Sequence, residues 1–338
     1  MTEPNIIKPV NVNKELLKVE DLYVEYSSNL EIVKAVNGVS FSLKQGETLG
    51  LVGETGAGKT TIARSILRIL PDPPAKVKKG EVFFKGTNLS TLSEPQMRKI
   101  RGHEISMIFQ DPMTALNPVL TIGEQISEAV RVHKNMNRKE AEIEGKKALE
   151  LVGISEERYY EYPHQFSGGM KQRVVIAIAL ACNPELLIAD EPTTALDVTI
   201  QAQVLNLIYE LQQKNKMAMI LITHDFGIVA ETCDNVAVVY AGEIVEYGSL
   251  RQIFKEPAHP YTVGLFGAIP SMTGDVERLH NIDGMPCDPT HLPEGCKFAP
   301  RCKYASAECN KPISAVDLEN GHQCRCIKAK DILMGKNE

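Results

Sequence analysis

The sequence predicts an α/β fold with a mostly parallel central sheet, and two observations carry this prediction. First, short apolar runs alternate along the chain with amphipathic stretches, as strands and helices do in strand–helix–strand units. Second, one such unit, from Leu49 to Leu70, joins a buried strand to a helix through residues 53–60, which read GETGAGKT. This stretch fits the G-x-x-x-x-G-K-[ST] pattern of a phosphate-binding loop, and both flanks have the required character.

The chemistry of this loop predicts binding of a nucleoside triphosphate. Its glycines allow backbone N–H groups to approach phosphate oxygens without a Cβ clash, and the following helix adds its N-terminal dipole. The Lys59 ammonium can reach the terminal phosphates and the Thr60 hydroxyl can bind Mg²⁺. The alternative, a glycine-rich turn that binds nothing, is disfavoured because all anchor residues and both flanks are present. The residues expected to touch ATP here are Thr55, Gly56, Ala57, Gly58, Lys59, Thr60 and Thr61.

The composition limits the classes of protein to which this chain can belong. The chain has 338 residues and a formal net charge of −6, which argues against a nucleic-acid partner. It contains no apolar run of the roughly 20 residues that a membrane span needs, and its polar N-terminus is not a signal peptide. We therefore expect a cytosolic protein. Six of its eight cysteines follow residue 286. Because cytosolic thiols stay reduced, this clustering suggests a metal before disulfides.

The first third of the chain predicts further strands around the loop. Residues 16–26 alternate apolar and polar, and residues 32–43 read as one or two further strands. We expect a loop at residues 71–79, followed by a short strand at 80–84. A buried strand at 105–109 ends at Gln110.

The middle of the chain predicts a helical insertion between two strands of the central sheet. From residue 121 to 153 the pattern is helical, with Ile122, Ile126, Ala129 and Val130 on one stripe and His133 on the same face. The remaining elements are expected to be helices at 171–181 and 200–213, buried strands at 186–189 and 217–223, and a hairpin of 236–240 with 243–247.

Polar side chains follow three of these buried strands. Asp190 and Glu191 end one strand, where Asp190 could bind Mg²⁺ and Glu191 could polarise an attacking water. By themselves they are equally well read as an ordinary strand-end turn. Gln110 could touch the metal or the water, and His224 could sense the γ-phosphate. Each of these two alone is more often structural.

A second helix start with the features of an anion site lies at residues 166–173. Ser167 is a good N-cap, and Gly168 and Gly169 permit close approach of the backbone to an anion. An ordinary capped helix is the alternative. The presence of a phosphate loop in the same chain favours the anion site.

The complete set of motifs resembles an ABC-type ATPase over residues 16–255. Residues 53–60 are similar to its Walker A loop, Gln110 to its Q-loop, 167–170 to its signature motif, 190–191 to its Walker B acids, 195–197 to its D-loop and His224 to its switch histidine. The signature departs slightly, with Phe166 where Leu is usual and Met170 where Gln is usual. The resemblance implies a P-loop ABC ATPase fold with an N-terminal antiparallel β subdomain and a helical subdomain at about 112–170.

The resemblance also implies roles for individual residues. Glu191, His224 and Gln110 would be catalytic, and Thr60, Gln110 and Asp190 would hold Mg²⁺. Tyr26 would stack on adenine. The residues that would complete the site of a partner subunit are Ser167, Gly168, Gly169 and Asp197.

A narrower resemblance links the chain to the ATP-binding subunits of oligopeptide and dipeptide ABC importers. It rests on residues 109–118, 162–170, 259–262 and 295–302. It implies ATP-driven peptide uptake at the cytoplasmic face of the membrane. The partners would be a homologous second ATPase (or a second copy in isolation), two permease subunits and, indirectly, an extracytoplasmic binding protein. Import of nickel or another small solute stays open, as does, less favoured, a soluble ABC ATPase outside transport.

The chain is expected to divide into a leader at 1–15, the ATPase domain at 16–255 that carries the resemblance, and, where the composition becomes proline-rich, a loop-rich, separate extension at 256–338. In this family the extension can hold a [4Fe–4S] cluster, and by position its ligands would be Cys296, Cys302, Cys309 and Cys326. The spacing alone leaves cluster and zinc about even, with unligated thiols as a less favoured third alternative. Cys324 is a rival for the fourth ligand, Cys287 falls outside the pattern, and Cys182 and Cys233 are expected to be core thiols.

Overall fold

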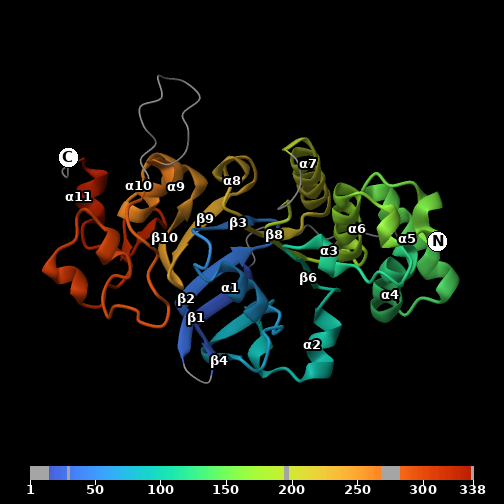
Figure 1. Cartoon of the computed structure of the whole chain (residues 1–338), viewed down its shortest axis with the longest axis horizontal. Coiled ribbons are helices and arrows are strands. Elements are labelled where there is room, and N and C mark those ends of the chain that lie inside the picture. The colour runs from blue at the N-terminus through green and yellow to red at the C-terminus, as the bar shows by residue number, and fades with distance from the viewer. Residues whose placement is uncertain (1–14, 29–30, 194–197, 268–281, 336–338) are drawn as a thin grey trace, which may run out of the picture.

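The computed structural model describes residues 15–28, 31–193, 198–267 and 282–335, which form the α/β fold that the sequence predicts (Figure 1). A small antiparallel sheet has the strand order β2-β1-β4-β5, and a large sheet has the order β11-β12-β10-β9-β3-β8-β7-β6. Within the described ranges, no helix is both long and apolar enough to cross a membrane.

The small sheet confirms the expected N-terminal antiparallel subdomain. It consists of β1 (Glu15–Ser27), β2 (Ile32–Lys44), β4 (Ala75–Phe84) and β5 (Thr87–Asn88). The prediction of a loop through residue 79 was wrong, since β4 begins at Ala75 and pairs with β1. Its lysines are exposed, and Lys78 and Lys79 lie 3.5 and 2.5 Å from carboxylates of Glu25 and Asp21. A solvent-facing strand with paired charges therefore looked like a polar loop.

The large sheet has a parallel core that brings strand ends to one edge. Its parallel strands are β3 (Thr48–Val52), β6 (Ile105–Ile108), β7 (Leu186–Asp190), β8 (Ala218–Ile222) and β9 (Asn235–Tyr240). Every residue of β3, β6, β7 and β8 is buried, which explains their continuous apolar runs. β10 (Glu243–Ser249) pairs with β9 as the expected hairpin.

Two helices in the first third of the chain differ from expectation. α1 (Lys59–Ile66) stops short of residue 70, because the backbone turns at Arg68, whose φ is 52°. α2 (Glu94–Ile100) was missed, although Ser93 and Gln96 form a capping box that marks its start. Short 3₁₀ turns lie at Leu89–Thr91, Glu156–Tyr160 and Pro163–Gln165.

The helical insertion lies to one side of the sheet (Figure 1). It contains α3 (Pro112–Ala115), α4 (Ile122–Lys134), α5 (Arg138–Leu151) and α6 (Gly168–Leu180). Ile122, Ile126 and Val130 are fully buried as predicted. His133 is only half-buried and stacks on His103, with ring centroids 5.8 Å apart.

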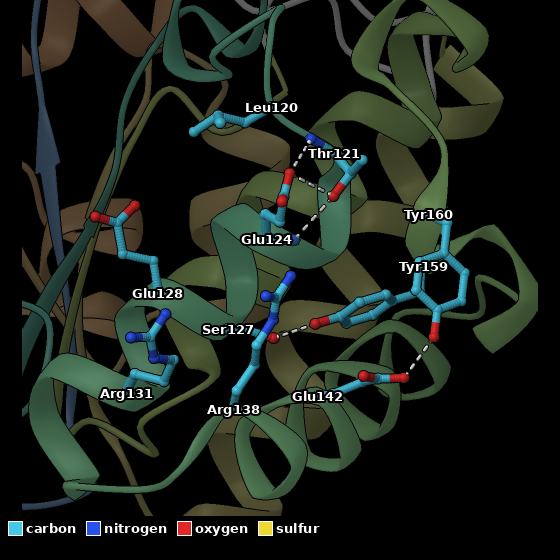
Figure 2. A pocket seen from close by; sticks show the side chains of 10 residues that line it. All are labelled: Leu120, Thr121, Glu124, Ser127, Glu128, Arg131, Arg138, Glu142, Tyr159 and Tyr160. Atoms are coloured by element: carbon cyan, nitrogen blue, oxygen red, sulfur yellow. Dashed lines mark hydrogen bonds between the residues drawn. The ribbon is translucent and has the colours of Figure 1, made fainter.

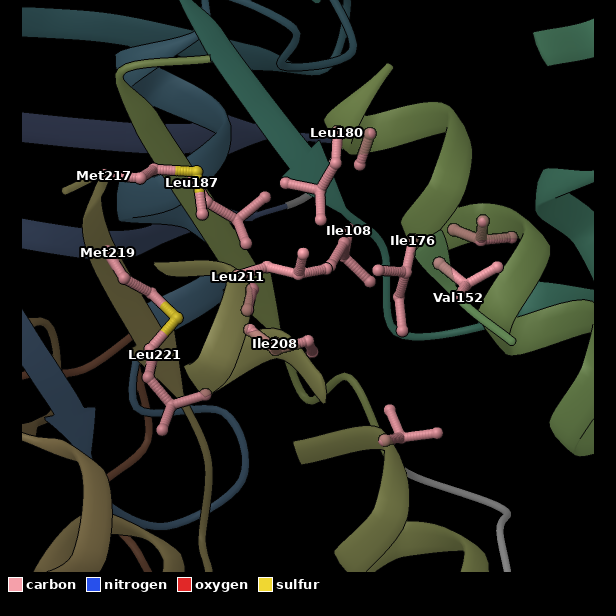
Figure 3. Close-up of a cluster of buried hydrophobic side chains, with 14 of the residues drawn as sticks. Ile108, Val152, Ile176, Leu180, Leu187, Ile208, Leu211, Met217, Met219 and Leu221 are labelled. Atoms are coloured by element: carbon pink, nitrogen blue, oxygen red, sulfur yellow. The ribbon is translucent and has the colours of Figure 1, made fainter. Parts of the chain in front are cut away.

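Helices α6 and α7 (Val198–Asn215) carry the apolar side chains that cover one face of the sheet. Figure 3 shows Ile176 of α6 and Ile208 of α7 beside Leu187 of β7 and Leu221 of β8, all at most 2% exposed. This shared core joins the insertion to the central sheet. The remaining helices of the ATPase part are α8 (Phe226–Thr232) and α9 (Leu250–Lys255).

The C-terminal extension is loop-rich as predicted, but the expectation that it is separate was wrong. It contributes α10 (Pro260–Gly267), β11 (Val316–Asp317), β12 (Gln323–Cys324), α11 (Ala329–Leu333) and 3₁₀ turns at Ala299–Arg301 and Ala307–Asn310. β12 pairs with β10 and thereby extends the central sheet. Tyr261 and Phe298 are buried in the same core as the sheet. The boundary near residue 255 stays a prediction.

Candidate nucleotide-binding site

The phosphate loop connects β3 to α1, and two of its glycines are required by the backbone. Gly53 and Gly58 have φ values of 148° and 102°. A Cβ at Gly53 would lie 2.1 Å from the carbonyl oxygen of Val239, and one at Gly58 would lie 2.4 Å from that of Ala35. These positions admit no side chain, so the loop is built against β9 and β2 by close backbone contact.

Lys59 at the start of α1 is folded over the loop. Its ammonium donates to the carbonyl oxygens of Gly53 at 2.7 Å and Glu54 at 2.9 Å. Burial lowers the pKa of Lys59, whereas the nearby carboxylates of Glu191, Asp190 and Glu54 raise it. The cation is therefore held in a largely desolvated position, where a phosphate anion would be a stronger acceptor than a carbonyl.

Thr60 and Asp190 form a pair of oxygen donors. The Thr60 hydroxyl donates to Oδ1 of Asp190 at 3.1 Å, joining α1 to the end of β7. Asp190 is 1% exposed, and burial raises the pKa of its carboxyl group, with Glu191 adding to the rise and the Thr60 hydrogen bond opposing it. A buried carboxylate beside a hydroxyl suits a hard cation such as Mg²⁺, which prefers oxygen ligands.

Glu191 is brought together with Gln110 and His224 from the ends of three neighbouring strands. Nε2 of Gln110 donates to Oε2 of Glu191 at 2.8 Å, and Nδ1 of His224 lies 3.4 Å from Oε1. Glu191 has a φ of 46°, and its N–H donates to the carbonyl of Ile222 at 2.9 Å. The structure thus gathers all three predicted catalytic residues around one carboxylate. In it, Gln110 contacts Glu191 rather than the Thr60–Asp190 pair.

Tyr26 reaches the loop from the small sheet. Its hydroxyl lies 3.3 Å from Oγ1 of Thr61, the third residue of α1. The side chain is half-buried near the C-terminal end of β1. This places an aromatic side chain beside the loop, as expected for adenine stacking, although that role stays a prediction.

The second anion-type helix start lies apart from the phosphate loop. Ser167 caps α6 by accepting from the N–H of Met170 at 3.4 Å, and Ser167 and Gly168 are exposed. Among the interactions of the described residues, none joins Ser167, Gly168 or Gly169 to residues 53–61. Asp197 lies outside the described residues. An exposed motif without a contact to the phosphate loop of its own chain is compatible with the expectation that it completes the ATP site of a partner subunit.

The four cysteines expected to bind a cluster lie near one another. The N–H of Cys296 donates to the carbonyl of Cys309 at 2.8 Å. Burial, together with the neighbouring Cys296, Cys302 and Cys309, raises the pKa of Cys326 to about 11. All are free thiols. However, nowhere in the described ranges do three or more His, Cys, Asp or Glu side chains form a group that could hold a metal ion. The expected core thiols Cys182 and Cys233 are buried.

Sequence reasoning missed two residues at the loop, both in the extension. The Tyr261 hydroxyl accepts from the N–H of Glu54 at 2.8 Å, and Arg301 pairs with the Glu54 carboxylate at 2.8 Å. Both belong to stretches that resemble peptide importers, residues 259–262 and 295–302, but nothing local assigns them a role. They are 207 and 247 residues away from Glu54 along the chain.

Taken together, these contacts define a class of protein. A phosphate loop with its lysine, a threonine–aspartate pair and a glutamate held by an amide and an imidazole form the site of a P-loop nucleoside triphosphatase.

Comparison with known proteins identifies the family. Residues 36–194 match the family described as "ABC transporter", and residues 245–309 match "Oligopeptide/dipeptide transporter, C-terminal region". The chain belongs to the family of ATP-binding proteins of ABC transporters, and it is an ABC-type ATPase that uses ATP. The predicted resemblance is thereby confirmed.

Similar proteins cover most of the chain. The dipeptide transport ATP-binding protein DppD of Bacillus subtilis (strain 168) is 52% identical, over 93% of this chain and 94% of the relative. The oligopeptide transport ATP-binding protein OppD of the same organism is 50% identical, over 86% of this chain and 82% of the relative. A solved dimeric ATP-binding cassette in a post-hydrolysis state, bound to ADP and phosphate, has a TM-score of 0.63 at 28% identity, covering 70% of this chain and 99% of that one.

Proposed function

We propose that this chain hydrolyses ATP to drive the uptake of di- or oligopeptides through a membrane ABC importer. The observation that carries the proposal is that both the ATPase part and the C-terminal extension match families of transport proteins. The ATPase part matches ABC transporters, and the extension matches a region described for oligopeptide and dipeptide transporters. The relatives named for dipeptide and oligopeptide transport support the same cargo.

The proposed chemistry is transfer of the γ-phosphoryl group to water, which depends mainly on positioning and charge stabilisation. Lys59 and the loop N–H groups bind the β- and γ-phosphates, and Glu191 orients and polarises the water. Gln110 and His224 hold the Glu191 carboxylate from two sides, and His224 exchanges this contact for the γ-phosphate. Thr60 and Asp190, with Gln110 as the third proposed ligand, would hold Mg²⁺, which would neutralise phosphate charge.

The second half of each site is proposed to come from another subunit. Ser167, Gly168 and Gly169 would cover the γ-phosphate of the partner, with Asp197 at the same interface. The exposure of Ser167 and Gly168 supports this arrangement, as does the dimeric state of the solved cassette. We expect a homologous ATPase as the partner in the cell and a homodimer in isolation. ATP would shift the pair toward closure, and hydrolysis would release it.

The helical insertion is the proposed contact to two permease subunits at the cytoplasmic face of the membrane. Between α4, α5 and the turn at Glu156–Tyr160 it carries an open hollow of about 460 Å³ (Figure 2). Charged side chains of both signs line it, among them Glu124 and Arg131. Tyr159 and Tyr160 are fixed there by hydrogen bonds of 2.5 Å to Ser127 and Glu142. An extracytoplasmic peptide-binding protein would act on the complex indirectly, through the permeases.

The extension is proposed to bind a [4Fe–4S] cluster through Cys296, Cys302, Cys309 and Cys326, with zinc as the alternative. Four thiols are the donor set that such clusters require, but the side chains would have to converge further than they do here. Cys326 is favoured over Cys324 as the fourth ligand. Cys324 is fully buried opposite Glu246 on β10, where a thiolate would meet a carboxylate.

Elemental analysis tests the cysteine site. Protein purified without air should contain about four iron and four sulfide per chain, and Cys302→Ser should lose them while Cys287→Ser keeps them. Zinc at one per chain would establish the alternative, and protein without iron, sulfide or zinc would refute both.

A pull-down tests the function. The tagged chain should co-purify with two permeases and a second ATPase, and ATP hydrolysis by this complex should be stimulated by a peptide-loaded binding protein. Stimulation by nickel-loaded but not peptide-loaded binding protein would assign the other cargo. Failure to associate with any membrane protein would favour a role outside transport.

A further inference from the structure

The phosphate loop carries an acidic residue at an unfavourable place. Glu54 follows the first glycine of the loop. Burial lowers the pKa of Lys59, and the Glu54 carboxylate is one of the nearby charges that oppose this shift. ATP brings several negative charges to the same loop. An uncompensated carboxylate there would repel the phosphates and compete for the Lys59 ammonium.

The C-terminal extension supplies the compensating charge. Nη1 and Nη2 of Arg301 donate to the two carboxylate oxygens of Glu54 at 2.8 and 3.1 Å, a two-pronged ion pair. The Arg301 side chain is only 6% exposed, and that of Glu54 is 26% exposed. Because the pair is largely shielded from water, removing Arg301 alone would leave a poorly solvated carboxylate without its partner, which costs more than breaking a surface ion pair.

Arg301 is itself held rigidly. Its Nε donates to the carbonyl of Asp283 at 3.0 Å, and Nη2 also reaches that of Ile282 at 3.4 Å. The guanidinium lies 5.9 and 5.8 Å from the ring centres of Tyr240 and Phe298. A preorganised guanidinium loses little entropy when it pairs, so the orientation of the Glu54 carboxylate follows from the fold of the extension.

A second contact from the extension fixes the backbone of the same residue. The Tyr261 hydroxyl accepts from the N–H of Glu54, and the Tyr261 ring is fully buried against Tyr240 and Phe298, with centroids 4.7 and 5.4 Å apart. The carbonyl of Glu54 in turn accepts from Lys59. All three polar parts of Glu54 are thus engaged, two by the extension and one by the lysine that binds phosphate.

We propose that Arg301 and Tyr261 are positioning residues for ATP binding: they neutralise and fix Glu54, and through it set the place of Lys59. The extension therefore forms part of the ATP site, through the residue next to Cys302 in the chain. The inference rests on ATP binding at the loop. The inference adds that the affinity for ATP depends on Arg301, which lies about 250 residues after Glu54 in the sequence.

The test is a double-mutant cycle on the full chain, with MgATP as the probe. Arg301→Met keeps an apolar stem against Tyr240 and Phe298 but removes the charge, and we expect it to raise the Kd and KM for MgATP about tenfold while kcat at saturation stays near wild type. Glu54→Gln in the same chain should restore affinity to within about threefold, because no carboxylate is left to repel ATP. High salt should shrink the Arg301→Met defect. Lys303→Met, an exposed charge two residues away, is the matched control and should bind as wild type.

Two results would overturn the proposal. One is wild-type affinity in Arg301→Met. The other is a double variant that binds as poorly as Arg301→Met alone, since the defect would then come from lost packing.

Two gentler variants serve if Arg301→Met does not fold. Tyr261→Phe should raise the KM several-fold with kcat retained, and an unchanged KM would count against the proposal. Glu54→Gln alone should bind MgATP at least as well as wild type, and a tenfold loss there would also overturn it. Lack of ATP binding by the unmutated chain would instead contradict the proposed function itself.

Discussion

Replacing Glu191 with glutamine removes the charge that is proposed to polarise water and leaves its surroundings almost unchanged. The carboxylate receives one contact from Gln110 at 2.8 Å and one from His224 at 3.4 Å. A glutamine has the same size and one carbonyl oxygen, so it can keep one of the two contacts. The lost hydrogen bond is worth about 1 kcal/mol, which a chain of this size tolerates.

The catalytic loss should be much larger than the structural one. A positioned base contributes roughly 10²–10⁴-fold to a rate, or about 3–5 kcal/mol at 1.36 kcal/mol per tenfold. Binding of ATP should change by less than about threefold, because Lys59 keeps its contacts to the loop carbonyls. Glu191→Gln should therefore bind ATP and hydrolyse it at least about a hundredfold more slowly.

Phosphate release under saturating MgATP, with binding measured in parallel by calorimetry, checks this expectation. Glu185→Gln is the matched control, since Glu185 precedes the same strand β7 at its opposite end and pairs with Lys85. It should hydrolyse ATP as wild type. Near wild-type turnover in Glu191→Gln would refute the role given to Glu191, and loss of ATP binding would refute the separation of binding from chemistry.

Three further outcomes follow from the site. Burial raises the pKa of Asp190, so the charged carboxylate lowers the folding stability above that pKa, and this cost disappears as the pH falls through it. Asp190→Asn should therefore raise the melting temperature of nucleotide-free protein at neutral pH by about 2 °C, while Mg²⁺-dependent hydrolysis is lost. A lowered melting temperature would contradict this. Gly168→Asp in a Glu191→Gln background should bind ATP but fail to dimerise with it in sedimentation runs, whereas ATP-dependent dimers would argue against a shared site. Tyr26→Ala should raise the KM for ATP about tenfold and Tyr26→Phe should not, because base stacking on an aromatic ring is worth about 1–3 kcal/mol; equal KM values for the two variants would exclude stacking.

Much of the site could be predicted because its parts are local. The glycines of the loop at 53–60 determine its backbone conformation, and its lysine and threonine follow at fixed spacing. Glu191, Gln110 and His224 each end an apolar strand, and parallel strands present these ends at one edge. Their convergence on one carboxylate therefore follows from the strand pattern, although the individual contacts could not be read from it.

The parts that escaped prediction depend on distant contacts. The exposed lysines of β4 look like a loop until their partner strand β1 supplies the carboxylates. The extension looked separate because its prolines break regular structure, yet β12 joins the central sheet and Tyr261 enters its core. Arg301 is one of many surface-type residues in sequence, and only the fold shows that it meets Glu54. No local pattern encodes such a pair.

Peptide uptake by the reconstituted complex tests the central claim most directly. Proteoliposomes that contain this chain, its partner ATPase and two permeases should accumulate a labelled dipeptide only when its binding protein is outside and ATP is inside. Accumulation should stop when Lys59→Ala replaces the wild-type chain. Uptake that is equally fast without ATP or with Lys59→Ala would contradict the account, as would ATP hydrolysis that never moves peptide.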